Sequence, residues 1–285
     1  MGGELPHPGL AWLLDHEDGR GWLERLPRLV DECAARWALS LEDPYPYAMA
    51  SLAMPAIGSD GERVVLKVQY PDREGTHEAA ALRRYDGNGA VRLLDEDPDR
   101  WAMLLERAEP GDHLSTVGGE AALEVLVGLL PRLSIEADEP FTLLEDEAAW
   151  WADTLRAGIG DRDVEIPGAL VDEALAAIEE LSPTQAERVL LHQDLHGDNV
   201  VAGTREPWLA IDPKPLVGER AFAVAPIVRS YELGHSREET IHRLDVLCDR
   251  LDLDRERARR WAIAQTVAWC DDERHLAAAV WLLDA

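Results

Sequence analysis

The stretch HQDLHGDN, residues 192–199, stands between apolar segments and decides how the rest of the chain is interpreted. The apolar residues 189–191 precede this stretch and are typical of a strand. Two more apolar segments, residues 200–202 and 208–211, follow it and are separated by residues 203–207, which begin with Gly and end with Pro. This pattern is typical of a hairpin. If Gly203 pairs with Trp208 across the loop 204–207, Val200 faces Ile211. That register also predicts that Asn199 faces Asp212, at the end of the hairpin that is fed by the loop carrying Asp194.

Three oxygen-bearing side chains would then meet at one place. A carboxylate beside an amide oxygen suits Mg²⁺ that also touches phosphate, so Asn199 and Asp212 are the predicted metal ligands. Asp194 can accept a hydroxyl proton, and metal holders with such a base are what phosphoryl transfer needs. The spacing H-x-D-x-x-x-x-N is matched by His192, Asp194 and Asn199. The alternative is a polar turn with a solvent-facing Asn, which the surrounding strand and hairpin disfavour.

The neighbouring polar residues of this stretch are interpreted differently. His192 is predicted to be a hydrogen-bonded structural histidine of the loop and not a catalytic base. His196 is open to either interpretation. Asp198 fits a turn-forming residue best.

Composition limits the partners. The chain has 285 residues, and 56 Asp and Glu against 28 Lys and Arg give a net charge of −28. Nucleic acid and anionic membranes would be repelled, so neither is expected as a partner, whereas a cationic ligand is compatible. A solvated acidic surface is the alternative meaning of this charge. The three cysteines show no metal-binding spacing, and the first residues lack a basic segment followed by an apolar one, so we expect a cytoplasmic protein.

The periodicity changes along the chain. Strand signals dominate the first third, and helical periodicity dominates after Glu109-Pro110-Gly111. We therefore expect an α+β protein of two lobes that meet at a hinge: residues 1–107 as a nucleotide-binding lobe with leading helices, and residues 108–285 as a catalytic and substrate-binding lobe. The expected helices are 21–39, 74–86, 119–133, 145–157, 168–181, 237–251 and 255–270, and the expected strands of the first lobe are 64–68, 91–94 and 101–105.

Lys67 is an unusual residue for its position. It lies in the apolar strand VVLKV, where an ammonium group costs free energy unless it reaches an anion. Nucleotide phosphates would supply the anion, and Glu78 on the following helix could hold Lys67 by an ion pair, with Glu74 as a competitor. The alternative is an edge-strand lysine whose ammonium extends into solvent. In a kinase fold, the backbone of Glu106 and Ala108 would contact the adenine edge.

A substrate site is expected between the Asp194 loop and the C-terminal helices. Glu232, Asp271 and Asp272 are acidic, and Trp269 offers a flat face, so a cationic, hydroxylated amino sugar would suit them. The alternative is that Asp271 and Asp272 simply begin a helix, where acidic groups stabilise the dipole.

Residues 190–201, LLHQDLHGDNVV, followed by residues 208–222, WLAIDPKPLVGERAF, resemble the aminoglycoside phosphotransferase superfamily. More narrowly, they resemble its streptomycin 6-phosphotransferase and hydroxyurea phosphotransferase group. The resemblance extends to residues 65–67, 77–82, 104–107 and 261–265, and so covers the chain from about residue 50 onward.

The resemblance implies a protein-kinase-like fold and a reaction. Asp194 matches the catalytic Asp, Asn199 and Asp212 match the metal ligands, Lys67 matches the phosphate-contacting Lys, and Glu78 matches its helix partner. The implied chemistry is transfer of the γ-phosphoryl group of ATP, or GTP, to a hydroxyl of an aminoglycoside-type antibiotic, with Mg²⁺. Two alternatives remain: a metabolic kinase of an amino sugar or a hydroxyurea-like compound, and a non-catalytic binding protein on a kinase fold.

The chain departs from the family pattern at three places. Gln193 replaces the usual Gly before the catalytic Asp. The segment from residue 51 to 61 has no G-x-G-x-x-G loop. Asp212 is followed by Pro213 and Lys214 in place of Phe-Gly, so the switching of protein kinases at this point is not expected.

Overall fold

A computed structural model of the chain describes residues 7–47, 49–158 and 164–285. Residues 1–6 lie outside these ranges. They are part of the segment from which the sequence analysis expects a cytoplasmic protein. The chain forms two compact units, Met1–Glu109 (unit 1) and Pro110–Ala285 (unit 2). The division falls at the Glu-Pro-Gly segment where the periodicity of the sequence changes.

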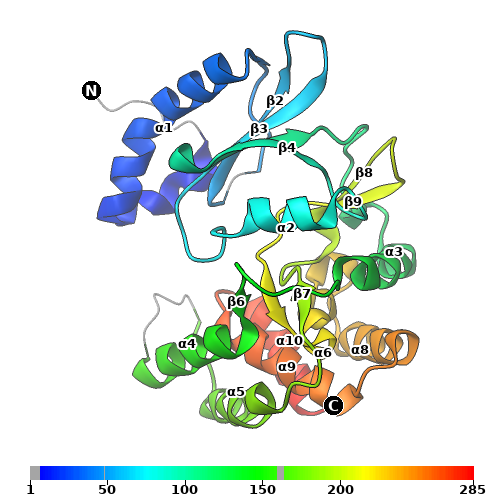
Figure 1. The fold of residues 1–285 in the computed structure, drawn as a ribbon. Coiled ribbons are helices and arrows are strands. Elements are labelled where there is room, and N and C mark those ends of the chain that lie inside the picture. Colours follow the sequence, from blue (N-terminus) through cyan, green and yellow to red (C-terminus); the bar gives the residue numbers. More distant parts are fainter. Residues whose placement is uncertain (1–6, 48, 159–163) are drawn as a thin grey trace. The chain divides into compact units, whose positions relative to one another are not determined.

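Unit 1 is built on one five-stranded sheet with the order β1-β2-β3-β5-β4, and every neighbouring pair is antiparallel. Figure 1 shows this sheet with its helices. The strands are β1 (Ser40–Leu41), β2 (Ser51–Ile57), β3 (Arg63–Gln69), β4 (Leu93–Asp97) and β5 (Ala102–Glu106). The helical elements are η1 (Pro8–Asp15), α1 (Glu17–Arg36), α2 (Glu78–Tyr85) and the 3-10 turn η2 (Pro98–Arg100). Trp22 and Leu26 of α1 pack in one core with Leu66 and Val68 of β3, because both elements are amphipathic.

Unit 2 is mainly helical. Its helices are α3 (Gly119–Leu133), α4 (Leu144–Ala157), α5 (Gly168–Leu181), α6 (Arg220–Ala223), α7 (Ala225–Arg229), α8 (Arg237–Leu251), α9 (Arg255–Ala268) and α10 (Glu273–Leu283). The predicted bounds of α3, α5 and α8 agree with the structure. Ser236 caps α8, since its Oγ accepts from the Glu239 N–H at 3.2 Å. The sequence did not predict α6 or α7, and it predicted α10 only in the alternative interpretation of Asp271 and Asp272 as a helix start.

Two small sheets lie within unit 2. One has the order β6-β10-β7, formed by Thr142–Leu143, Leu216–Gly218 and Val189–Leu191. The other is the predicted hairpin of β8 (Val200–Ala202) and β9 (Trp208–Ala210). The 3-10 turn η5 (Gly197–Asn199) leads directly into β8, so the residues 192–199 connect the two sheets.

The predicted register of the hairpin is wrong by one residue. Val200 pairs with Ala210, and Ala202 pairs with Trp208. The cause is a tighter loop, in which the Gly203 N–H donates to the Pro207 carbonyl at 3.2 Å. A Cβ at residue 203 would lie 2.9 Å from the Leu209 side chain, so this closure needs glycine. Asn199 is therefore opposite Ile211, and Asp212 is one position beyond it.

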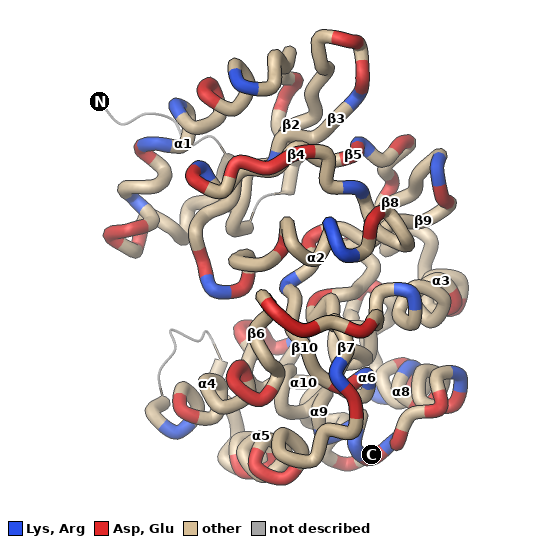
Figure 2. Tube along the Cα trace, viewed as in Figure 1, with Lys and Arg blue, Asp and Glu red and all other residues tan. Residues whose placement is uncertain are grey.

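The charged residues are spread over both units (Figure 2), so the acidic balance is not concentrated on one element. Cys33, Cys248 and Cys270 are buried and unbridged. Within the described ranges, no helix combines the length and the apolar character that crossing a bilayer requires.

Candidate active site

His192 fixes the start of the loop. Its Nε2–H donates to the Ile211 carbonyl at 2.9 Å, and its own carbonyl accepts from the Lys214 N–H at 3.0 Å. Burial lowers the pKa of His192 to about 4, so the ring is neutral at pH 7. The prediction of a structural, hydrogen-bonded histidine is confirmed.

Gln193 adopts a backbone conformation that favours glycine. Its φ is +64°, in the left-handed region that costs an L residue about 1 kcal/mol or more. The Gln193 carbonyl accepts from Nε2 of the fully buried Gln265 at 2.9 Å. The positive φ explains why the family pattern usually has Gly at this position. In this chain the bond from Gln265 of α9 holds the Gln193 backbone in that conformation.

Asn199 orients Asp194. The Asn199 Nδ2 donates to the Asp194 carbonyl at 2.9 Å and to Asp194 Oδ2 at 3.1 Å. Both groups come from the same short loop, and the second bond fixes the carboxylate relative to the start of β8. The amide nitrogen of Asn199 is thus committed to Asp194, and its Oδ1 lies on the other side of the amide group.

Three basic side chains surround the Asp194 carboxylate. Lys214 Nζ lies 3.4 Å from Oδ2, and Arg229 Nη2 and His196 Nε2 each lie 3.8 Å from Oδ1. Burial alone would raise the pKa of Asp194, but the charges of Lys214, His196 and Arg229 outweigh burial and hold it well below its usual range. Asp194 is therefore ionised at every pH at which the protein is expected to work.

Glu232, a predicted substrate residue, is a neighbour of the Asp194 loop. Its Oε1 accepts from His196 Nδ1 at 2.8 Å and from the Gly197 N–H at 3.0 Å. Burial opposes ionisation of Glu232, but the bond from His196 prevails and lowers its pKa to about 2. Burial would lower the pKa of His196, and the bond to Glu232 with the Asp194 charge raises it instead. The role of Glu232 toward a substrate stays a prediction.

The other predicted substrate residues lie where α9 ends and α10 begins. Lys214 Nζ and Arg229 Cζ lie 4.8 and 5.0 Å from the Trp269 ring centroid. Asp272 caps α10 by accepting from the Arg274 and His275 N–H groups at 2.9 and 2.8 Å, as the helix-start interpretation expected. The Asp271 side chain is 77% exposed and contacts His275 at 2.8 Å. Their roles toward a substrate also stay predictions.

Unit 1 contains the predicted Lys67–Glu78 ion pair. Lys67 Nζ lies 2.7 Å from both Glu78 carboxylate oxygens, and the two residues are 4% and 2% exposed. Gln69 also donates to Glu78. Glu106 ends β5, and its N–H donates to the Arg92 carbonyl at 2.9 Å. Ala108 lies just beyond the strand.

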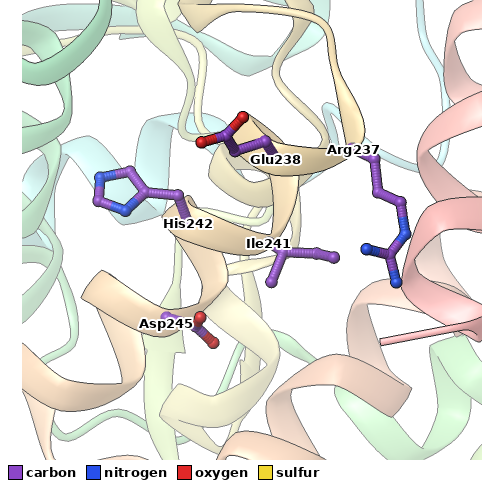
Figure 3. A pocket seen from close by; sticks show the side chains of 5 residues that line it. All are labelled: Arg237, Glu238, Ile241, His242 and Asp245. Carbon is purple, nitrogen blue, oxygen red and sulfur yellow. The ribbon is translucent and has the colours of Figure 1, made fainter.

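A surface hollow of about 540 Å³ lies elsewhere, on α8. Figure 3 shows its lining residues, Arg237, Glu238, Ile241, His242 and Asp245. All five come from one helix, and no predicted site residue is among them. The hollow is therefore separate from the Asp194 loop.

Comparisons with known proteins connect this geometry to a family. Residues 36–273 match the family model described as aminoglycoside/hydroxyurea antibiotic resistance kinase. A hydroxyurea phosphotransferase from Kitasatospora aureofaciens is 40% identical over 261 residues, which cover 88% of this chain and 74% of that protein. A streptomycin 6-kinase from Streptomyces griseus is 38% identical over 273 residues, which cover 87% and 83%.

Solved structures confirm the predicted α+β, protein-kinase-like fold. A choline kinase from Streptococcus pneumoniae superposes with a TM-score of 0.66 at 12% identity, covering 92% of this chain and 100% of that one. The aminoglycoside phosphotransferase APH(4)-Ia superposes with a TM-score of 0.61 at 17% identity, covering 90% and 96%. Together with the family match and the two relatives, these results lead to one conclusion: the chain belongs to the aminoglycoside/hydroxyurea antibiotic resistance kinase family.

Proposed function

We propose that this protein transfers the γ-phosphoryl group of ATP to a hydroxyl group of an aminoglycoside-type antibiotic, in the manner of a streptomycin 6-kinase. The observation that carries the proposal is the Asp194 carboxylate, which Asn199 orients and three basic side chains keep ionised. The 38% identity to a streptomycin 6-kinase supports the choice of acceptor.

The nucleotide is assigned to unit 1, which contains the lobe expected at residues 1–107, and to Ala108 just after that lobe. Lys67 contacts the phosphates, and the buried carboxylate of Glu78 keeps the ammonium in place, because an unpaired buried charge is costly. The backbone at Glu106 and Ala108 contacts the adenine edge. The Glu106 N–H donates to the Arg92 carbonyl, and the carbonyl of Glu106 is the group proposed to meet the base. A reaction that consumes ATP also favours a cytoplasmic location.

The metal is assigned to Asn199 and Asp212 in unit 2. The Asn199 amide nitrogen is taken by Asp194, so the amide presents its oxygen elsewhere, and Asp212 adds a carboxylate. These are oxygen donors, which fit Mg²⁺. When bound, Mg²⁺ neutralises negative charge on the phosphate oxygens.

Asp194 acts by orientation more than by basicity. Its pKa is held far below the usual range, so its thermodynamic pull on a hydroxyl proton is weak, whereas its charge and fixed position align the acceptor. In the step, the acceptor oxygen bonds to the γ-phosphorus while the bond from that phosphorus to the bridging oxygen breaks. The nucleoside diphosphate keeps the electron pair, and the hydroxyl proton passes through Asp194 to solvent. A loose transition state needs little base strength.

The acceptor is assigned to the C-terminal part of unit 2. Asp271 is the most exposed of the four predicted substrate residues, so we assign to it the first contact with a cationic acceptor. Glu232 contacts the Asp194 loop, and Trp269 and Asp272 lie at the end of α9 and the start of α10. A hydroxyurea-like acceptor is the second candidate, because the hydroxyurea phosphotransferase is 40% identical to this chain.

The test compares the parent with Asp194→Asn, and with Asp198→Asn as a matched change on the same loop. Each is incubated with Mg²⁺ and ATP or GTP against streptomycin, hydroxyurea and an amino sugar, and phosphorylated product is measured by mass spectrometry. We expect streptomycin to be phosphorylated, Asp194→Asn to lose about 10³-fold in turnover, and Asp198→Asn to stay near the parent. Product from hydroxyurea alone would favour the second candidate. Nucleotide binding without any phosphorylated product would favour the alternative of a non-catalytic binding protein on a kinase fold.

A further inference from the structure

Lysine is almost absent from this chain. Of its 28 Lys and Arg residues, only Lys67 and Lys214 are lysines. Arginine offers a planar, bidentate guanidinium, whereas lysine offers a compact point charge on a flexible stem. We therefore infer that a compact ammonium is favoured at the two positions that carry lysine in place of arginine. Lys67 is the lysine proposed to contact the nucleotide, and Lys214 is the one to which the proposed function assigns no role.

Lys214 reaches the reacting group of the proposed function. Its backbone is tied to the loop through the bond from its N–H to the His192 carbonyl at 3.0 Å. Its Nζ lies 3.4 Å from Asp194 Oδ2 and 4.8 Å from the centre of the Trp269 ring. The backbone bond and the aromatic face together aim the ammonium at the carboxylate, while 34% of the side chain remains exposed to an incoming group.

Arg229 is the contrast. Its side chain is only 7% exposed, its Nη1 donates to the buried Gln265 at 2.6 Å, and it shares the Trp269 ring with Lys214. Arg229 is thus locked into the interior and acts on Asp194 as a positioning residue. Of these two residues, Lys214 is the one that an acceptor or a phosphoryl group can approach from solvent.

Two basic side chains besides His196 lie at the Asp194 carboxylate. His196 is paired with Glu232, at 2.8 Å. Lys214 and Arg229 bring two positive charges to within 3.8 Å of Asp194. In a chain with a net charge of −28, two cationic groups at one carboxylate are a local concentration of positive charge. Such cations suit the approach of an anion to Asp194.

We propose that Lys214 is a catalytic residue that contacts the γ-phosphoryl group during its transfer; this inference rests on the proposed function. As the acceptor oxygen bonds to the γ-phosphorus and the bridging bond breaks, negative charge spreads over the phosphoryl oxygens. The Lys214 ammonium, on the Trp269 face, lies on the Asp194 side of that group and donates hydrogen bonds to its oxygens. Lys214 keeps its proton throughout, and the hydroxyl proton follows the route through Asp194.

The experiment uses full-length parent, Lys214→Met, Lys214→Arg and the control Arg250→Met. Arg250 pairs with Glu124 at 2.8 Å on the surface of unit 2, so its substitution removes the same charge away from the loop. Two quantities are measured: steady-state turnover, and the affinity of Mg·ADP with and without fluoroaluminate, which mimics the phosphoryl group in transfer. Thermal unfolding checks that each variant is folded.

For Lys214→Met, we expect kcat to fall about 10²- to 10³-fold, as when one transition-state donor is removed, with the KM for ATP little changed. Its affinity for Mg·ADP alone should stay at the parent value, while the tightening by fluoroaluminate is lost. Lys214→Arg should recover part of both losses, and Arg250→Met should match the parent.

Equal fluoroaluminate tightening in Lys214→Met and the parent would overturn the inference, and so would a parent whose Mg·ADP complex does not tighten. These outcomes are separable from failure of the proposed function. A parent that tightens with fluoroaluminate but phosphorylates no antibiotic overturns only the acceptor assignment. A parent that binds no nucleotide overturns both.

Discussion

A neutral histidine in the loop makes stability depend on pH. His192 is 4% exposed, and burial lowers its pKa to about 4, whereas in the unfolded chain it binds a proton near pH 6.5. As the pH falls through 6.5, the unfolded state gains protons first, so the free energy of unfolding decreases until the folded ring also titrates. The loss from this residue amounts to about 3 kcal/mol between those two values.

The measurement is urea unfolding between about pH 7 and pH 4.5, for the parent and His192→Asn, where the amide can still donate to the Ile211 carbonyl. The variant should be less stable at pH 7 and should show a flatter decline. Asp194 and Glu232, whose pKa values are lowered, begin to lose their contribution at about pH 5, so most of their effect lies below this window and is the same in both proteins. A decline of equal slope in both proteins would contradict the assignment.

Gln193 offers a test of backbone strain. Its φ of +64° is open to glycine and costly for alanine. Gln193→Gly and Gln193→Ala both remove the side chain, so they differ mainly in this conformational term. We expect the Gly variant to be more stable than the Ala variant by about 1 kcal/mol, measured by urea unfolding. Equal stability would mean that the local backbone adjusts at no cost.

At the residue scale, the sequence predicted the groups of one short segment and the Lys67–Glu78 pair, but not the particular contacts that other segments make with the Asp194 loop. Asp194 and Asn199 are five positions apart, and their contact follows from loop geometry. Glu232 meets His196 from 36 positions away, and no spacing signals that contact. The sequence pattern marks Lys214 only as part of the family segment 208–222 and of the departure from Phe-Gly. Its scarcity in the composition was the one signal that could have singled it out.

At the element scale, the hairpin β8–β9 depends on a single glycine. A Cβ at Gly203 would lie 2.9 Å from the Leu209 side chain and 3.0 Å from the Glu206 carbonyl oxygen. Gly203→Ala should therefore cost about 1–3 kcal/mol through overpacking. By moving Asn199 relative to Asp212, it should also raise the Mg²⁺ concentration needed for half-maximal turnover.

Gly128 provides the opposite case. It lies in α3, and a Cβ there meets nothing within 4 Å. Gly128→Ala should stabilise the protein by about 0.5–1 kcal/mol, because alanine loses less backbone freedom in a helix. Thermal and urea unfolding of the two variants side by side give the comparison. Destabilisation of both to the same extent would show that the close contact at Gly203 is not the cause.

The elements that the sequence predicted well have long, regular periodicity. The bounds of α3, α5 and α8 followed from such patterns and from the Ser236 cap. The strand β10 was missed because Leu216–Gly218 is three residues long and pairs with β6, whose residues are about 70 positions earlier. The register of β8–β9 was missed because it depends on steric closeness at Gly203, which residue types alone do not reveal.

At the scale of the whole molecule, the net charge of −28 dominates. Like charges repel across the folded chain, and added salt screens this repulsion. The midpoint of thermal unfolding should rise by at least about 2 °C between about 0.05 and 0.5 M KCl. Chloride is preferred to sulfate, which strengthens apolar burial independently. A falling midpoint would mean that the local ion pairs, which salt also weakens, outweigh the overall repulsion.

The scarcity of lysine makes the protein unusually simple for chemical labelling. Lys67 is 4% exposed and ion-paired, whereas 34% of the Lys214 side chain is exposed. A mild acylating reagent that modifies amines therefore finds one accessible side-chain amine, beside Asp194. Peptide mass mapping would locate the adduct. The labelling rate in the presence of different ligands would show which of them shields the Lys214 ammonium from the reagent.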